Sequence, residues 1–239
     1  MTIHPKLPTN PIFVALDTPD LDKAIAWSEE LHGHVGGIKV GLEFFSANGA
    51  EGVRRIVDLG MPLFLDLKFH DIPNTVAGAV RAVADLGATI INVHAAGGPA
   101  MLAAAREAAE KSVTRPLVIA VTVLTSLDDS DLSVVGQAIP ARDQVVRLAQ
   151  LAKSEGLDGV VCSPGEIRAI RDACGDKFKL IVPGIRPNWT ASSDQKRITT
   201  PSQAHNDGAD ILVIGRPITD TKDPAAAAIR ILEELGFCR

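Results

Sequence analysis

Residues 64–76 read FLDLKFHDIPNTV, an apolar run that carries charged side chains toward its end. Successive side chains of a strand alternate between its two faces, so Asp66 and Lys68 are expected on one face and the leucines beside them on the other. A further acid, Asp71, follows directly after the run. Buried charges are costly unless they are paired. The stretch therefore predicts a buried strand that delivers an ion pair to its end, where a functional site is expected.

Eight apolar or β-branched runs of this kind recur along the chain, each followed by a longer segment with helical spacing. They are PIFVALD (11–17), VGGIKVG (35–41), PLFLDLKF (62–69), TIINVHA (89–95), PLVIAVTVL (116–124), GVVCS (159–163), KLIVPGI (179–185) and ILVIGRPI (211–218). Strands that alternate with helices predict βαβ units and a parallel sheet. This number of units favours an α/β protein with a (β/α)8 TIM barrel. An open doubly wound sheet is the alternative, but residues 15–24 lack the GxGxxG turn that would favour it.

The length and composition indicate one large core. The chain has 239 residues, of which 46% are hydrophobic, so we predict a single barrel domain over residues 1–239. One connection is longer than the usual βα loop of about 2–6 residues. It reads RPNWTASSDQKRITTP and spans residues 186–201. A segment of this length after the seventh run is either disordered or a lid.

Charge and cysteine content narrow the class of protein. A formal net charge of −5 and a pI near 5.7 argue against nucleic-acid binding, which favours a basic stripe or a high pI. The three cysteines are widely spaced, so neither a disulfide framework nor a zinc site is indicated. The N-terminus lacks the apolar run of a signal peptide, and no stretch approaches the roughly 20 apolar residues of a membrane span. We expect a cytoplasmic protein that binds neither nucleic acid nor membrane.

Polar side chains gather at the predicted carboxyl ends of the strands, where barrel active sites lie. In chain order they are Asp17, Lys39, Asp66, Lys68, His94, Thr125, Arg186 and Arg216. A structural ion-pair network explains any one of the charged residues equally well. Four charges at the ends of the first three strands are harder to explain in this way, because a fold rarely accumulates buried charges for stability alone. The pattern favours an active site, in which we assign no catalytic role to His94.

The loops after the last two strands form a candidate phosphate site. They read VPGIRP (182–187) and IGRPIT (214–219). In barrels these loops often bind phosphate through backbone N–H groups and a helix N-terminus. Gly184 and Gly215 let the backbone approach an anion, and Arg186 and Arg216 supply charged donors. The simpler interpretation is that glycine and proline only mark turns. We favour the phosphate site. Because the long segment at 186–201 begins in one of these loops, we interpret it as a phosphate-side lid.

These motifs resemble the orotidine 5′-monophosphate decarboxylases of the bacterial type over nearly the whole chain. The resemblance rests on ALD (15–17), KVG (39–41), DLKFHDIPNT (66–75), VLTS (123–126), VPGIR (182–186) and GRPI (215–218), which fall in family order. It implies decarboxylation of orotidine 5′-monophosphate to uridine 5′-monophosphate (UMP) and CO2, the last step of de novo pyrimidine nucleotide biosynthesis. It also implies a homodimer with shared active sites.

The resemblance further implies a role for each site residue. The catalytic residues would be Lys68, as the proton donor, with Lys39, Asp66 and Asp71. The substrate-binding residues would be Asp17 and Lys39 at the ribose hydroxyls, Thr125 at the pyrimidine, and Arg186, Gln195, Gly215 and Arg216 at the phosphate end. Asp71, Ile72 and Thr75 would reach across the homodimer interface into the neighbouring site.

The chemistry of this reaction fits the charged residues without a cofactor or a metal ion. Loss of CO2 from C6 of orotate leaves electrons in an in-plane orbital that the ring's π system delocalises poorly, so a preorganised cation must stabilise them. The ammonium of Lys68 supplies that charge and then donates its proton to C6. Asp66 and Asp71 are expected to hold the ammonium in place and keep it protonated.

Three alternatives use the same barrel differently. A metal-dependent sugar-phosphate decarboxylase of the 3-keto-gulonate 6-phosphate decarboxylase type shares a similar DxKxxD segment and holds an enediolate with a divalent ion. The VLTS motif and the long segment with Gln195 argue against it. A Schiff-base aldolase needs a neutral lysine amine, which flanking acids disfavour. A non-catalytic phosphate-ligand sensor has no use for a fixed proton donor.

Overall fold

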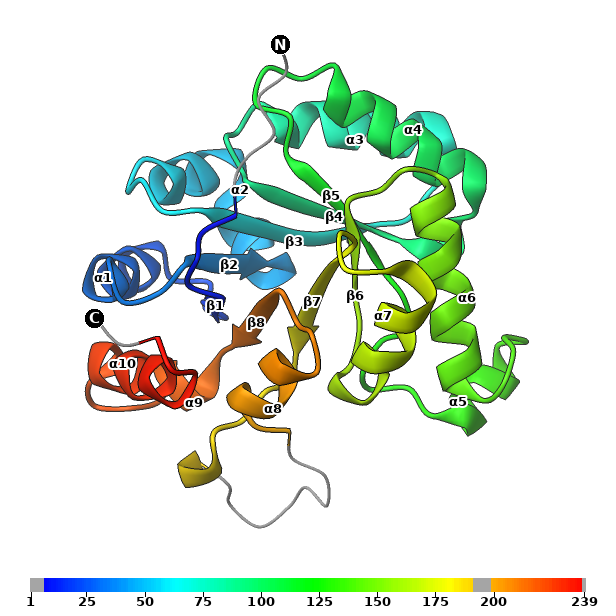
Figure 1. The fold of residues 1–239 in the computed structure, drawn as a ribbon. Coiled ribbons are helices and arrows are strands. Elements are labelled where there is room, and N and C mark those ends of the chain that lie inside the picture. Colours follow the sequence, from blue (N-terminus) through cyan, green and yellow to red (C-terminus); the bar gives the residue numbers. More distant parts are fainter. Residues whose placement is uncertain (1–6, 191–198, 238–239) are drawn as a thin grey trace.

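The computed structural model describes residues 7–190 and 199–237, which form a closed barrel of parallel strands surrounded by helices (Figure 1). The strands follow one another around the barrel in chain order, and the last strand closes the ring by pairing with the first. They are β1 (Ile12–Ala15), β2 (Gly37–Gly41), β3 (Leu63–Phe69), β4 (Ile90–His94), β5 (Leu117–Val121), β6 (Gly159–Val161), β7 (Lys179–Pro183) and β8 (Ile211–Ile214). The predicted (β/α)8 TIM barrel is confirmed.

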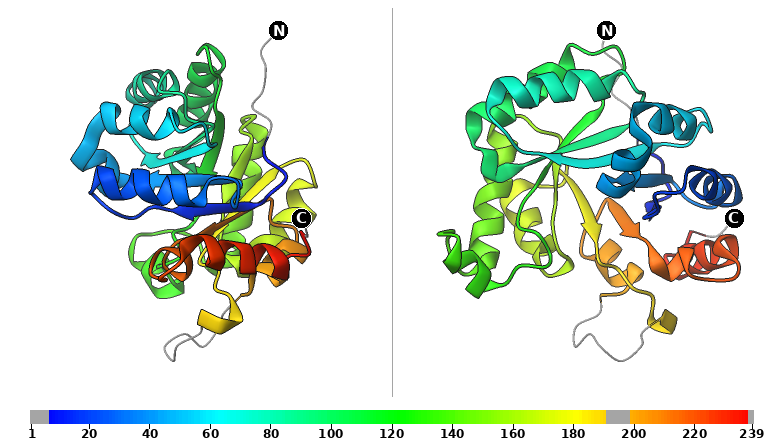
Figure 2. Two further views of the ribbon diagram at one scale, coloured as in Figure 1. Left: turned by 90° about the vertical axis from the view of Figure 1, so that its left-hand side faces the viewer. Right: turned by 180° about the vertical axis from the view of Figure 1, so that it is seen from behind.

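The helices lie outside the strands, as the two views of Figure 2 show. They are α1 (Leu21–Leu31), α2 (Leu42–Val57), α3 (Pro73–Ala84), α4 (Pro99–Glu110), α5 (Asp129–Val134), α6 (Ala141–Ser154), α7 (Ile167–Cys174), α8 (Pro201–Asn206), α9 (Arg216–Thr219) and α10 (Pro224–Glu234), with short 3-10 turns η1 (Ala95–Gly97), η2 (Pro164–Glu166) and η3 (Asn188–Thr190). Asp20 starts α1 by accepting a hydrogen bond from the Lys23 N–H at 3.1 Å, which satisfies a donor that the first helical turn leaves unpaired. In the described part of the chain, no helix has both the length and the apolar character needed to cross a membrane.

Two apolar layers follow from the alternation of side chains along the strands. Val14 and Ile38 belong to a large outer core that the strands share with the helices. Phe13 and Phe64 belong to an inner core at the centre of the barrel, where they are 0% and 2% exposed. Burial of each such side chain contributes roughly 1.5–3 kcal/mol. The filled centre leaves ligand binding to the rim, as is usual for this fold.

Some strands end earlier than the apolar runs of the sequence. The run at 211–218 forms β8 only as far as Ile214, and Arg216–Thr219 is already the helix α9. Pro217 has no N–H to donate to a neighbouring strand and suits the first turn of a helix. The run at 116–124 likewise ends as a strand at Val121. The rest of the first run therefore forms the start of α9, and the rest of the second run begins the loop after β5.

Only the two ends of the long connection at 186–201 belong to the described residues. The Arg186 N–H donates to the carbonyl of Thr199 at 3.2 Å, so the two ends lie side by side. Residues 191–198, which include Gln195, lie outside the described part of the chain. The phosphate-side lid stays a prediction.

Candidate active site

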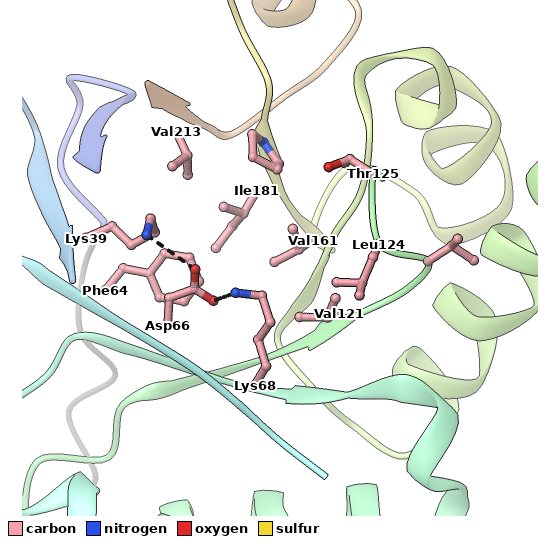
Figure 3. Close-up of a pocket in the computed structure, with 12 residues that line it drawn as sticks. Lys39, Phe64, Asp66, Lys68, Val121, Leu124, Thr125, Val161, Ile181 and Val213 are labelled. Carbon is pink, nitrogen blue, oxygen red and sulfur yellow. Dashed lines mark hydrogen bonds and ion pairs between the residues drawn. The ribbon is translucent and has the colours of Figure 1, made fainter. Parts of the chain in front are cut away.

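A cavity of about 190 Å³ opens at the carboxyl ends of the strands (Figure 3). Its charged residues are Lys39 from β2 and Asp66 and Lys68 from β3. Apolar side chains from β5 to β8 face them, and they are Val121, Val161, Ile181, Pro183 and Val213. Thr125, in the loop after β5, also lines the cavity. A charged wall opposite an apolar wall suits a flat ring on which charge develops at one edge.

The charged wall is a row of alternating charges. Lys39 Nζ lies 3.2 Å from Asp17 Oδ1 and 3.4 Å from Asp66 Oδ2. Lys68 Nζ lies 2.6 Å from Asp66 Oδ1. The order across the strand ends is therefore Asp17, Lys39, Asp66 and Lys68. The structure brings these four predicted residues together from three neighbouring strands.

Asp66 lies at the centre of this charged row, and its side chain is only 12% exposed. Burial acts to raise the pKa of its carboxyl, but the ammonium groups of Lys39 and Lys68 and a hydrogen bond from Asn92 outweigh that effect. The pKa of Asp66 therefore lies below its ordinary value, and the side chain is a carboxylate at neutral pH. It is a fixed negative charge between two cations.

Lys68 interrupts the regular course of β3. Its φ of 52° lies in the left-handed region, which costs a residue other than glycine roughly 1–2 kcal/mol. Leu65 and Phe69 are four positions apart on β3 but pair with residues two positions apart on β4, so the strand bulges between them. Simple alternation predicted that Asp66 and Lys68 share a face. Their side chains do meet, but the backbone between them is a bulge and not a regular strand.

Asn92 is a site residue that the sequence pattern did not predict. It lies on β4 with 0% exposure. Its Nδ2 donates to Asp66 Oδ1 at 2.6 Å, and its Oδ1 accepts from the Lys68 N–H at 2.7 Å. The available signal was an amide side chain in the middle of the apolar run TIINVHA, because a buried polar group needs a partner.

Asp71, Ile72 and Thr75 are exposed at the start of α3 and do not line the cavity. The Asp71 carboxylate accepts a hydrogen bond from the Ile72 N–H at 2.6 Å. Among residues 7–190 and 199–237, no ion pair joins Asp71 to Lys68. Within one chain the Lys68 ammonium pairs with Asp66, and the role of Asp71 at the site stays a prediction.

The loops after β7 and β8 form a second cavity of about 300 Å³. Its lining residues are Arg186, Thr190, Arg216, Pro217, Asp220 and Thr221. The structure thus brings the two predicted arginines to one place. Gly184 has a φ of 77°, which glycine adopts readily. A Cβ on Gly215 would lie 3.7 Å from Asp17 Oδ2, so this loop also approaches the charged row.

His94 ends β4 close to the charged row. Its ring centroid lies 5.4 Å from that of His70. Burial, together with electrostatic interactions with His70 and Lys68, lowers the pKa of His94 below its ordinary value. The ring is therefore neutral at neutral pH, and it supplies no charge to the site.

Comparison with known proteins gives the family. The sequence model of the orotidine 5′-phosphate decarboxylase / HUMPS family matches residues 10–231. An orotidine 5′-phosphate decarboxylase of Paramagnetospirillum magneticum is 55% identical over 233 residues, which cover 95% of this chain and 99% of that protein. An orotidine 5′-phosphate decarboxylase of Rhodospirillum rubrum is 56% identical over 232 residues, which cover 95% of this chain and 94% of that protein. The crystal structure of orotidine 5′-phosphate decarboxylase from Lactobacillus acidophilus has a TM-score of 0.83 at 37% identity and covers 95% of this chain and 99% of that chain. The chain therefore belongs to the orotidine 5′-phosphate decarboxylase / HUMPS family.

Proposed function

We propose that this protein converts orotidine 5′-monophosphate to UMP and CO2, as the last step of de novo pyrimidine nucleotide biosynthesis. The observation that carries the proposal is the row of Lys39, Asp66 and Lys68 facing an apolar cavity. The relatives that are 55% and 56% identical bear the name of this activity, which supports the choice of substrate.

The charged row suits the electronic demand of the reaction. Loss of CO2 leaves an electron pair at C6 in the plane of the ring, and a nearby fixed cation lowers the energy of that state. Lys68 is such a cation, because Asp66 holds its ammonium at 2.6 Å. Apolar walls strengthen the interaction by keeping water away from it. Once CO2 has left, the same ammonium donates a proton to C6 and yields UMP.

The rest of the substrate is assigned to the remaining site residues. Asp17 and Lys39 bind the ribose hydroxyls; the Asp17 side chain is 67% exposed and so accessible to a ligand. Thr125 contacts the pyrimidine from the rim of the same cavity. The phosphate is bound by Arg186, Gln195, Gly215 and Arg216. The shared cavity of the two arginines supports this last assignment.

A homodimer with shared active sites completes the proposal. Ile72 is 67% exposed at the start of α3, and Leu42 is 56% exposed at the start of α2. Both large apolar side chains follow strands that line the site, where a second copy would cover them. Asp71 of the partner subunit would then approach Lys68, and Ile72 and Thr75 would enter the site beside it.

The main rival is the metal-dependent sugar-phosphate decarboxylase. Among residues 7–190 and 199–237, no group of three or more His, Cys, Asp or Glu side chains is placed to hold a metal ion. Both carboxylate oxygens of Asp66 already face lysine ammonium groups, at 3.4 and 2.6 Å. This arrangement suits the cation-assisted mechanism better than a metal-held enediolate.

The direct test is to add orotidine 5′-monophosphate to purified protein and to follow the loss of orotate absorbance. The expected result is decarboxylation without added cofactor, with UMP as the product. Absence of any reaction across a range of buffers would overturn the proposal.

We place the enzyme in the cytoplasm, which the free thiols of Cys162 and Cys174 support.

A further inference from the structure

The amide of Asn92 bridges the two charged residues of β3 that line the cavity. It donates to Asp66 Oδ1 at 2.6 Å and accepts from the Lys68 N–H at 2.7 Å. The partners fix which way the amide points, because a carboxylate only accepts and a backbone N–H only donates. Asn92 itself is fully buried and does not line the cavity. Within the part of the chain that the structure describes, its side-chain hydrogen bonds reach the site through these two residues.

The bond to the Lys68 N–H supports the bulge of β3. Pairing between β3 and β4 shifts register between Leu65 and Phe69, so the ladder supplies no regular carbonyl partner inside the bulge. A buried N–H without an acceptor is unfavourable. Asn92 Oδ1 serves as that acceptor while Lys68 holds its φ of 52°. The amide therefore stabilises the backbone conformation that directs the Lys68 side chain.

The hydrogen bond from Asn92 to Asp66 restrains the carboxylate that pairs with the Lys68 ammonium. Asp66 Oδ1 receives both the Lys68 ammonium, at 2.6 Å, and the Asn92 amide, while Oδ2 faces Lys39. Because the amide is neutral, it restricts rotation of the carboxylate without adding a charge that competes with the ammonium. One side chain thus holds Lys68 at its backbone and, through Asp66, at its ammonium.

We propose that Asn92 is a positioning residue for the decarboxylation, which places the Lys68 ammonium against C6 without contacting the substrate. This inference rests on the proposed function and adds a residue to its machinery. A misplacement of about 1 Å in a reacting group costs on the order of 10²-fold in rate. Loss of Asn92 should therefore appear in kcat. A purely structural role would lower stability and leave the kcat of the folded protein unchanged.

The first variant is Asn92→Leu, which keeps the branching of the side chain and removes both hydrogen bonds. We expect kcat to fall about 10²-fold, while KM and the affinity for UMP stay within about threefold, because the ground-state contacts remain. The matched control is Ile91→Val on the same strand, whose side chain packs in the outer core. It should lower the Tm and leave kcat unchanged.

The second variant is Asn92→Asp, which keeps an oxygen for the Lys68 N–H but loses the donor to Asp66. Burial and the neighbouring Asp66 raise the pKa of the new carboxyl; above that pKa its carboxylate repels Asp66, and kcat should be low. As the pH falls, protonation of the new carboxyl restores an O–H donor, and kcat should recover relative to wild type at the same pH. The kcat of the variant is divided by the kcat of wild type at each pH, which corrects for the charged and titratable groups that both proteins share near position 92. These groups are Lys39, Asp66, Lys68, His70 and His94.

The outcomes separate this inference from the function on which it rests. A wild type that does not decarboxylate orotidine 5′-monophosphate overturns both. An active wild type with an Asn92→Leu kcat within about threefold of it, or with a loss confined to KM, overturns the positioning role alone. If Asn92→Leu does not fold, Asn92→Asp decides the question. If the kcat of Asn92→Asp relative to wild type stays constant over the pH range in which the new carboxyl titrates, the inference is overturned.

Discussion

Replacing Lys68 with alanine removes the cation that the proposed mechanism places beside the reacting carbon, and it leaves the rest of the charged row paired. Asp66 keeps Lys39 at 3.4 Å and the Asn92 amide at 2.6 Å, so no isolated buried charge is created and the fold should persist. A positioned proton donor contributes about 10²–10⁴ in rate, and a preorganised charge about 10²–10³. Because Lys68 supplies both effects, we expect kcat to fall by at least about 10⁴-fold, which corresponds to about 5.4 kcal/mol.

The assay is the loss of orotate absorbance, with UMP affinity and Tm measured on the same protein. UMP has no carboxylate at C6, so its affinity should change little. Lys179→Ala is the matched control, because Lys179 is also a strand lysine in an ion pair, at 2.8 Å from Asp210, but does not line the cavity. This control should retain normal turnover. If Lys68→Ala decarboxylates within about tenfold of wild type, the assignment of Lys68 as cation and proton donor is refuted.

Three further predictions test the metal, the dimer and the phosphate site. Exhaustive EDTA treatment should leave activity unchanged and Mg²⁺ should not raise it; loss on chelation that Mg²⁺ restores would favour the sugar-phosphate rival. Mixing inactive Asp71→Ala with inactive Lys68→Ala should restore about half of the wild-type activity per mixed dimer, because one of two symmetric sites is then intact. If the mixture stays inactive although subunit exchange is demonstrated, both residues belong to one chain's site. Arg216→Ala should lower kcat/KM for orotidine 5′-monophosphate by about 10²-fold, in line with a lost charge-assisted bond, and should barely affect the slow reaction of orotidine, which has no phosphate. An equal fractional loss with both substrates would remove Arg216 from the phosphate site.

The barrel could be predicted because each strand is a short apolar run and each is followed by a helical pattern. Where the strands end was harder to predict. Apolar residues of the run at 211–218 continue past the strand, since Ile218 is buried in the helix α9 and not in the sheet. Local hydrophobicity indicates burial but does not distinguish a strand from the helix turn that follows it.

The charged row could be predicted because carboxyl ends of neighbouring parallel strands meet at one rim, which brings Asp17, Lys39 and Asp66 together. The bulge at Lys68 and the bridging amide of Asn92 could not be predicted. Both depend on the register between β3 and β4, which the alternation of side chains within one strand does not specify. The position of Asp71 was likewise open, since nearness in sequence to Lys68 does not fix where its carboxylate points.

The left-handed backbone of Lys68 sets a limit on how this enzyme can be made more heat-resistant. Glycine is the residue that best tolerates this conformation, yet glycine carries no ammonium. The residue that would fold most easily at position 68 and the residue that the proposed chemistry requires are therefore different. Engineering for thermal resistance must leave this position alone and seek its gains in the outer core and in helices remote from β3 and β4.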